Sequence, residues 1–234
     1  MMKFLLAFIL CCFALASRIL VASPGPQAQT AAPGSQGQAA APSLDDRLFN
    51  AAGNGDTAAI AQLLAQGAHV DAQSADGNTP LMAATAMGKI DVVKLLLDKG
   101  ANPSLSDKTG RTALEFAAMT GNLEAAKLLL DKNAPVNTKN GEGLTPLMYG
   151  VISHNLELEN LLLDHGADVE AHDPHGFTSL MAASGGGFTD IVKTLLDHGA
   201  NINDKSDDGS TALSLATGRN HTDVADLLRA KGAQ

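Results

Sequence analysis

The chain is poor in aromatic residues and in positive charge. It contains no tryptophan, one tyrosine and seven phenylalanines among its 234 residues, and 16 basic residues against 25 acidic ones, for a net charge of −9. Proteins that bind nucleic acids use basic patches, and many stack bases on aromatic side chains. Anionic membrane surfaces also attract basic segments. The composition therefore argues against nucleic acid and against an anionic membrane as partners.

Cysteine is almost absent, and both cysteines lie in an apolar run at the N-terminus. Lys3 is followed by FLLAFILCCFALA, which ends in the cleavage-site pattern Ala14-Leu15-Ala16. A short apolar run after a positive charge and before small residues is typical of a secretory signal peptide. We predict that residues 1–22 contain a signal peptide cleaved near Ala16, so that the mature protein is periplasmic or secreted.

An uncleaved membrane anchor is the alternative, because apolar residues resume at Ile19. Arg18 interrupts that span and leaves it shorter than the roughly 20 residues that a transmembrane helix needs. Cleavage would leave the mature chain without cysteine, which excludes disulfides, thiolate-bound metals and a cysteine nucleophile. Residues 23–43 contain only Ser, Pro, Gly, Gln, Ala and Thr, a composition that predicts a flexible linker.

The rest of the chain repeats itself every 33 residues. In each copy a glycine is followed two positions later by threonine and four positions later by leucine, which predicts a helix N-cap and an apolar helical face. A second apolar helix follows and ends at a glycine in most copies, as at Gly100. The period is typical of stacked repeats that bury their faces against one another. The glycines are Gly77, Gly110, Gly143, Gly176 and Gly209, and the threonines are Thr79, Thr112, Thr145, Thr178 and Thr211.

The repeated unit resembles the ankyrin repeat. The T-P-L-H-x-A motif of that family appears here as Thr79-Pro80-Leu81-Met82-Ala83-Ala84 and as Thr145-Pro146-Leu147-Met148-Tyr149-Gly150. The resemblance implies an all-α solenoid of antiparallel helix pairs joined by protruding β-hairpin fingers. It also implies a concave face that binds other proteins, with no catalysis and no cofactor.

Some motif positions depart from the family pattern. The motif histidine is replaced in every copy, so we expect the local hydrogen-bond network to change while apolar packing persists. Glycines at helix ends are replaced by Asn133, His154 and Asn220, residue types that tolerate a positive φ, so we expect these turns to persist. The replacements of the histidine are Met82, Glu115, Met148, Met181 and Ser214.

The register extends one copy earlier, since Gly55 lies 33 residues before Gly88. Gln62 and Arg229 replace leucines of the inner copies, as the polar outer faces of capping repeats require. We therefore predict one domain of six repeats, residues 44–234. The repeats fall at about 44–75, 76–108, 109–141, 142–174, 175–207 and 208–234.

No group of residues predicts catalysis. His172-Asp173-Pro174-His175 has metal-ligand spacing, but two more ligands would be needed. Asp173 also occupies a position that holds Ser, Asp or Asn in the other copies, which favours a role in the turn. Gly185-Gly186-Gly187 lacks both the preceding strand and the Gly-Lys-Ser/Thr ending of a phosphate loop. We predict no catalytic residue, no metal and no cofactor.

In ankyrin-like arrays the partner contacts the finger tips and the ends of the first helices. The residue after each finger glycine is polar in the outer repeats and apolar in the middle, as at Leu144 and Phe177, and the helix-end position is bulkiest in the middle. An apolar centre with a polar surround is typical of protein interfaces, although single exposed apolar residues are also ordinary. Phe116 and Tyr149 lie one period apart on the predicted core face, and we expect them to be buried. The predicted partner-binding residues are Arg111, Met119, Leu144, Ile152, His175, Phe177 and Phe188.

The sequence thus predicts an exported, monomeric, non-catalytic module that binds another protein. Acidic residues in the fingers suggest a basic patch on that partner, although they also suit turns and solubility. A secreted effector or inhibitor of a host or competitor protein is the alternative within binding. The alternatives of other classes are an enzyme with a composite site that no motif reveals, and a passive spacer.

Overall fold

Helix pairs follow one another throughout residues 41–234, the part of the chain that the computed structural model describes. The predicted signal peptide, residues 1–22, and nearly all of the predicted linker, residues 23–43, lie outside the described residues. The described region is all-helical, with twelve helices and no strands, as the six predicted repeats require. They are α2 (Leu44–Asn54), α3 (Thr57–Ala65), α4 (Pro80–Ala86), α5 (Ile90–Asp98), α6 (Ala113–Met119), α7 (Leu123–Asp131), α8 (Pro146–Ser153), α9 (Leu156–Asp164), α10 (Ser179–Gly186), α11 (Thr189–Asp197), α12 (Ala212–Gly218) and α13 (Thr222–Ala230).

The first helix of each inner repeat begins at its threonine. The Thr79 hydroxyl accepts a hydrogen bond from the backbone N–H of Met82 at 3.2 Å, and each equivalent threonine caps its own helix in the same way. A side-chain oxygen at the N-cap satisfies a backbone donor that the helix itself cannot. The first repeat differs, because its helix starts earlier and is capped by Ser43.

The helix ends confirm the predicted left-handed turns. Asn133, His154 and Asn220 have φ values of 60°, 52° and 60°, and Gly100 has a φ of 88°. Three non-glycine residues therefore adopt the backbone conformation that glycine adopts at the equivalent positions of other repeats.

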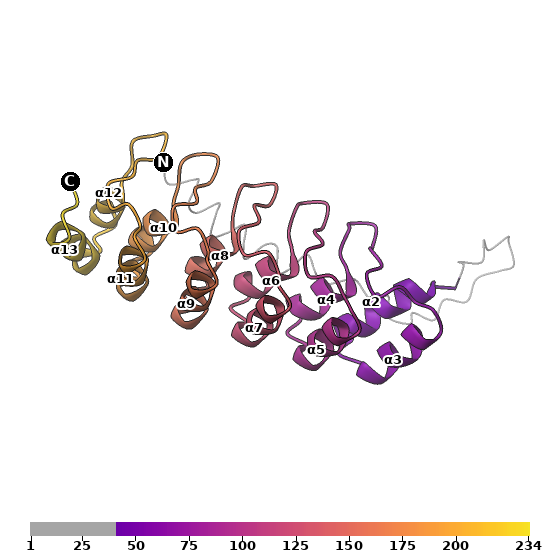
Figure 1. Cartoon of the computed structure of the whole chain (residues 1–234). Coiled ribbons are helices and arrows are strands. Elements are labelled where there is room, and N and C mark those ends of the chain that lie inside the picture. Colours follow the sequence, from indigo (N-terminus) through magenta and orange to yellow (C-terminus); the bar gives the residue numbers. More distant parts are fainter. Residues whose placement is uncertain (1–40) are drawn as a thin grey trace, which may run out of the picture. The chain divides into compact units, whose positions relative to one another are not determined.

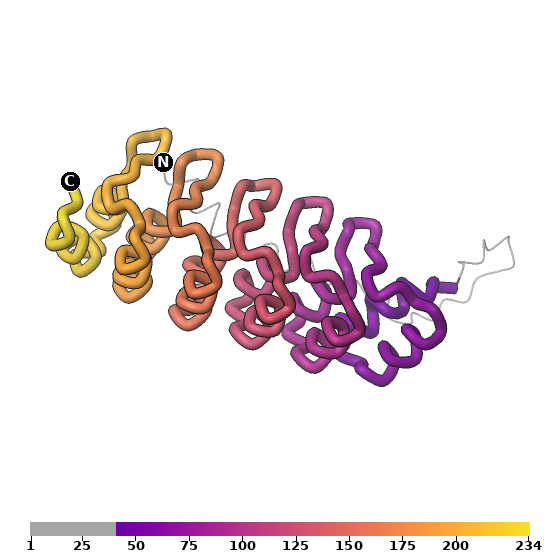
Figure 2. The backbone as a smooth tube through the Cα atoms, in the orientation of Figure 1, coloured from indigo at the N-terminus to yellow at the C-terminus, as the bar shows by residue number. Residues whose placement is uncertain are grey.

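The helices stack in the order of the sequence. The first helices α2, α4, α6, α8, α10 and α12 pack on one another, and each second helix packs on the first helix of its own repeat and on the neighbouring second helices. Within this region the hairpin loops project along one edge of the stack (Figure 1) and recur at regular intervals along the backbone (Figure 2). Fully buried leucines recur in register between the helices, as at Leu81, Leu114 and Leu147. Phe116 and Tyr149 are buried as predicted.

Main-chain hydrogen bonds join one finger to the next. The N–H of Lys108 donates to the carbonyl of Asp76 at 2.9 Å, and the N–H of Gly141 donates to the carbonyl of Thr109 at 2.7 Å. The same bond recurs from Asp207 to His175 at 2.9 Å. These bonds form a finger ladder that needs no particular side chain. Two of the fingers each contain one antiparallel β-bridge, as in a short β-hairpin. The bridges join Ser106 to Thr112 and His172 to Thr178.

The position of the motif histidine is buried in the second to fifth repeats and exposed at Ser214 in the sixth, and its contacts differ between repeats. Met82 accepts weakly from the N–H of Thr79 through sulfur at 3.5 Å, and Ser214 accepts from the N–H of Thr211 at 2.8 Å. Glu115 instead accepts from the hydroxyl of Thr138 at 3.0 Å, and its second oxygen has no partner. Burial raises the pKa of Glu115 to about 8. The network does change, as expected, and one copy of it contains a buried carboxyl group.

Candidate partner-binding surface

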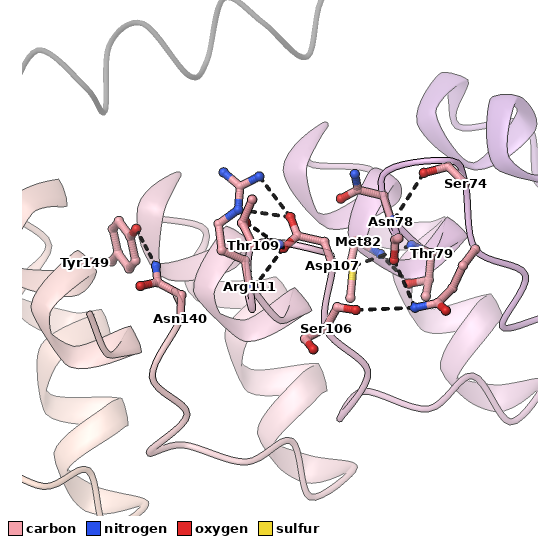
Figure 3. Close-up of polar contacts among 12 residues, drawn as sticks. Ser74, Asn78, Thr79, Met82, Ser106, Asp107, Thr109, Arg111, Asn140 and Tyr149 are labelled. Carbon is pink, nitrogen blue, oxygen red and sulfur yellow. Dashed lines mark hydrogen bonds and ion pairs between the residues drawn. The ribbon is translucent and has the colours of Figure 1, made fainter. Parts of the chain in front are cut away.

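One polar side chain in each finger holds the tip in shape. Oδ1 of Asp107 accepts from the backbone N–H groups of Thr109 and Arg111 at 2.8 and 3.0 Å. Asn140 does the same for its own finger, and so does Asp173 (Figure 3 shows the contacts of Asp107). Such bonds from Asp or Asn to the following backbone stabilise turns. Asp173 therefore serves the turn, as its position predicts.

Arg111 is largely occupied within its own finger. Its Nε and Nη2 atoms donate to Oδ2 of Asp107 at 3.0 and 2.9 Å, and its guanidinium lies 5.0 Å from the ring centroid of Phe116. Only 15% of the Arg111 side chain and 1% of the Asp107 side chain are exposed. Burial opposes ionisation of Asp107, but hydrogen bonds from Thr109 and Arg111 outweigh it and hold the pKa below its ordinary value. The positive charge of Arg111 is thus already paired.

Leu144 does not lie on the surface. It is 3% exposed, so the prediction that its side chain forms part of an exposed apolar patch is wrong. Its backbone N–H donates to Oδ1 of Asn140, and the residue directly precedes the helix cap Thr145. The side chain is buried against the array, because burial of a leucine is favourable wherever the chain allows it. Phe177, at the same position of the next finger, remains partly exposed, and His175 is exposed.

The predicted residues separate into two groups at opposite ends of the first helices. Arg111 and Phe177 precede N-caps, whereas Met119 and Ile152 lie at the C-terminal ends of α6 and α8. Helices of seven or eight residues at about 1.5 Å per residue place those ends roughly 10 Å apart. We call Arg111, His175 and Phe177 the finger group. The helix-end group consists of Met87, Met119, Ile152 and Phe188.

Met87 is the residue that sequence reasoning missed. The residue is 41% exposed, and it is the only large apolar residue within 41–234 that is exposed. It is the C-cap residue of α4, and the equivalent positions of the other repeats hold Asn54, Thr120, Ser153, Gly186 and Arg219. The sequence could have indicated this residue, because Met87 is the one large apolar residue at a position that is small or polar in the other repeats. Since α4 packs on α6 and α6 on α8, the helix-end group runs across consecutive repeats.

Phe188 contacts the preceding repeat and its own repeat. Its ring stacks on His154 of the preceding repeat, with centroids 4.1 Å apart and planes inclined by 16°. It also lies against Gly186, where an added Cβ would approach the ring to 2.6 Å. The carbonyl of Gly185 accepts from Nη1 of Arg219 at 2.9 Å and lies 3.1 Å from Nε2 of His221. A Cβ added to Gly187 would approach Nδ1 of His221 to 2.5 Å, so Gly185 and Gly187 both lie against the next repeat. Gly185 and Gly186 belong to α10 rather than to a loose turn.

Most acidic residues of the fingers have structural partners. Asp71 accepts from the backbone N–H of Asn102 at 2.9 Å, and Glu170 accepts from that of Asn201 at 2.7 Å. Asp208 accepts from Ser206 and Ser210, which lowers its pKa. Asp76, Glu142 and Asp207 are exposed. Glu170 and Asp208 are exposed as well, so these hydrogen bonds leave most of the acidic finger residues on the surface.

Residues 41–234 contain neither a metal-binding cluster nor a membrane-spanning helix. No three His, Cys, Asp or Glu side chains in this region are grouped closely enough to hold a metal ion. None of its helices combines the length and apolarity needed to cross a membrane.

A stack of short antiparallel helix pairs with hairpin loops along one edge defines a helical repeat scaffold. The family of ankyrin repeats (3 copies) matches residues 48–140, 102–173 and 170–234, and the chain belongs to this family. The fold resembles the crystal structure of the ankyrin repeat domain of Bcl-3, described as a unique member of the IkappaB protein family. That match has a TM-score of 0.73 and 33% sequence identity, and covers 81% of this chain and 87% of the other. No curated protein gives a significant match to the chain. Ankyrin repeats form a family of non-catalytic interaction scaffolds, and they indicate that this chain is a protein–protein interaction module.

Proposed function

We propose that the chain is an exported, monomeric module that binds a partner protein through the helix-end group and the finger group. The observation that carries this proposal is the helix-end group, in which Met87 is exposed and Met119, Ile152 and Phe188 are partly exposed on consecutive repeats. Apolar side chains that remain accessible along one row are typical of the centre of a protein interface. The partner surface that fits them is apolar, with basic residues opposite Asp76, Glu142 and Asp207.

Substitutions taken from the chain itself test the surface with little risk to the fold. Met87→Thr, Met119→Ala and Ile152→Ala introduce residues found at the same positions of neighbouring repeats, namely Thr120 and Ala86. Phe177→Ser copies Ser210 in the same way and tests the finger group separately. Each variant would be used as bait beside the wild-type protein in a pull-down from an envelope extract of the source organism.

A matched control comes from the second helices. Leu128 and Leu161 are partly exposed, and their equivalents in the first and fifth repeats are Gln62 and Thr194. The Leu128→Thr/Leu161→Thr variant therefore removes apolar surface outside both groups. A partner that the control retains and the helix-end variant loses would support the proposal. Equal retention by all variants would refute the proposed surface, and an empty wild-type lane would favour a passive spacer.

Export rests on the apolar run before Ala16 and has its own test. N-terminal sequencing of the protein recovered from its host should begin shortly after Ala16. Recovery of a chain that starts at Met1 or Met2 would refute cleavage.

A further inference from the structure

The fourth repeat has a carboxyl group in its core. Glu159 lies in α9 with none of its surface exposed, and neither carboxyl oxygen has a hydrogen-bond partner. The same position in the other repeats is apolar and buried or nearly so, as the 33-residue register shows. Its equivalents are Ile60, Val93, Ala126, Val192 and Ala225. A charge in such a place is strongly unfavourable, because no dipole replaces the lost water.

Gly150 on α8 makes room for this side chain. A Cβ added to Gly150 would lie 2.9 Å from Oε2 of Glu159 and 3.3 Å from Cδ1 of Leu162. Every other repeat has alanine at that position: Ala51, Ala84, Ala117, Ala183 and Ala216. Glycine in a helix interior disfavours the helix relative to alanine. The fourth repeat therefore has a weaker first helix and a larger, ionisable side chain in its second helix.

No opposite charge compensates Glu159. Burial is the sole cause that raises its pKa, to about 8. Among the elements packed on α9, helix α8 contributes only the buried phenol of Tyr149 as a titratable group. The charged side chains of α7, α9 and α11 other than Glu159 are all exposed: Glu124, Lys127, Asp131, Glu157, Asp164, Asp190, Lys193 and Asp197.

The same repeat also lacks a rung of the finger ladder. The position equivalent to the donors Lys108, Gly141 and Asp207 is Pro174, which has no N–H to offer to the carbonyl of Glu142. The missing rung weakens the connection of the fourth repeat to the fifth independently of Glu159.

We propose that the fourth repeat, residues 142–174, is where the array opens first, and that deprotonation of Glu159 drives the opening as pH rises. In a repeat protein each unit is stabilised mainly by its neighbours, so one weak unit can open without unfolding the whole array. Opening here separates the first three repeats from the last two. It also removes Ile152 from the helix-end group.

Hydrogen exchange of the full chain, followed by mass spectrometry at pH 6 and pH 8 and corrected for intrinsic exchange rates, tests the proposal. We expect the protection of α8 and α9 to fall by about tenfold per pH unit, because one proton is lost on opening. The protection of α4 and α5 should change much less. An equal change in all four helices would overturn the proposal, because it would mean that the array opens as a whole.

Three variants assign the effect to Glu159. Gly150→Ala/Glu159→Val copies the Ala84 and Val93 pair of the second repeat, and should abolish the pH dependence in α8 and α9. Glu159→Gln keeps the size without the charge and should do the same, which provides a second test if the first variant folds poorly. Glu157→Gln, an exposed site two residues away, should leave the pH dependence intact. Persistence of the dependence in the first two variants would assign it elsewhere.

Discussion

Glu115→Met is the substitution whose effect can be worked out most fully from the structure. Three other repeats have methionine at this position, at Met82, Met148 and Met181, so the new side chain suits the site. Glu115 itself is 1% exposed, with one oxygen bonded to Thr138 and the other unpaired. The substitution removes the buried carboxyl group together with its hydrogen bond to Thr138.

Proton linkage determines whether the free energy of unfolding rises or falls with pH. The ordinary pKa of the carboxyl is 4.5, and burial raises it to about 8 in the folded chain. The folded state therefore binds more protons than the unfolded state between these values, and the free energy of unfolding falls as pH rises. At about 1.4 kcal/mol per pKa unit, the loss from pH 5 to pH 8 is on the order of 3 kcal/mol for Glu115 alone. Glu159 adds a loss of the same sign.

Urea unfolding at pH 5 and pH 8 measures this difference directly. Wild type should be markedly less stable at pH 8. Glu115→Met should be close to wild type at pH 5, where it loses one hydrogen bond worth about 1 kcal/mol. At pH 8 it should be more stable by roughly 2 to 3 kcal/mol, and it should retain about half of the wild-type pH dependence. Glu124→Gln, at an exposed glutamate on α7, is the control and should behave as wild type. Equal wild-type stability at the two pH values would refute the reasoning for both buried glutamates.

Three further predictions concern packing and turns, and each is checked by urea or thermal unfolding. Phe116→Ala should cost about 3 to 5 kcal/mol, because the ring is fully buried, and an unchanged melting temperature would contradict this. Tyr149→Phe should cost about 1 to 2 kcal/mol, because it leaves the buried Nδ2 of Asn140 without its acceptor at 2.9 Å. A loss as large as that of Phe116→Ala would show that more than one hydrogen bond is involved. Asn133→Gly should raise stability by up to about 1 kcal/mol, because glycine adopts a φ of 60° without strain, and a loss would count against that account.

The regular part of the fold could be predicted from the sequence. The glycine and threonine register places the helix starts, and the left-handed turns at Asn133, His154 and Asn220 follow from the same alignment of repeats. This succeeds because each repeat supplies several versions of one local structure. A departure in one copy can then be judged against the others.

The surface could be predicted only in part. The register assigns Leu144 and Phe177 to one position, yet one is buried and the other partly exposed. The direction of a loop side chain depends on its contacts with the neighbouring finger. The 33-residue repeat aligns equivalent positions but does not predict those contacts. Glu159 was missed for another reason. An acidic residue among Ile60, Val93 and Val192 was visible in the sequence, but its consequence depends on complete burial and on the space left by Gly150.

The finger ladder also bears on how binding specificity could be changed. Its hydrogen bonds join backbone groups, as from Lys108 to Asp76 and from Asp207 to His175. They therefore do not depend on which side chains these residues have. Substitutions at the finger tips can therefore change binding specificity without altering the hydrogen bonds between repeats. The exception is proline at the donor position, because proline has no N–H. Pro174 shows that the chain already contains one such exception. A library randomised at the tips of the second and third fingers would keep its scaffold, whereas the junction before Pro174 is the place at which two different half-arrays could be joined or exchanged.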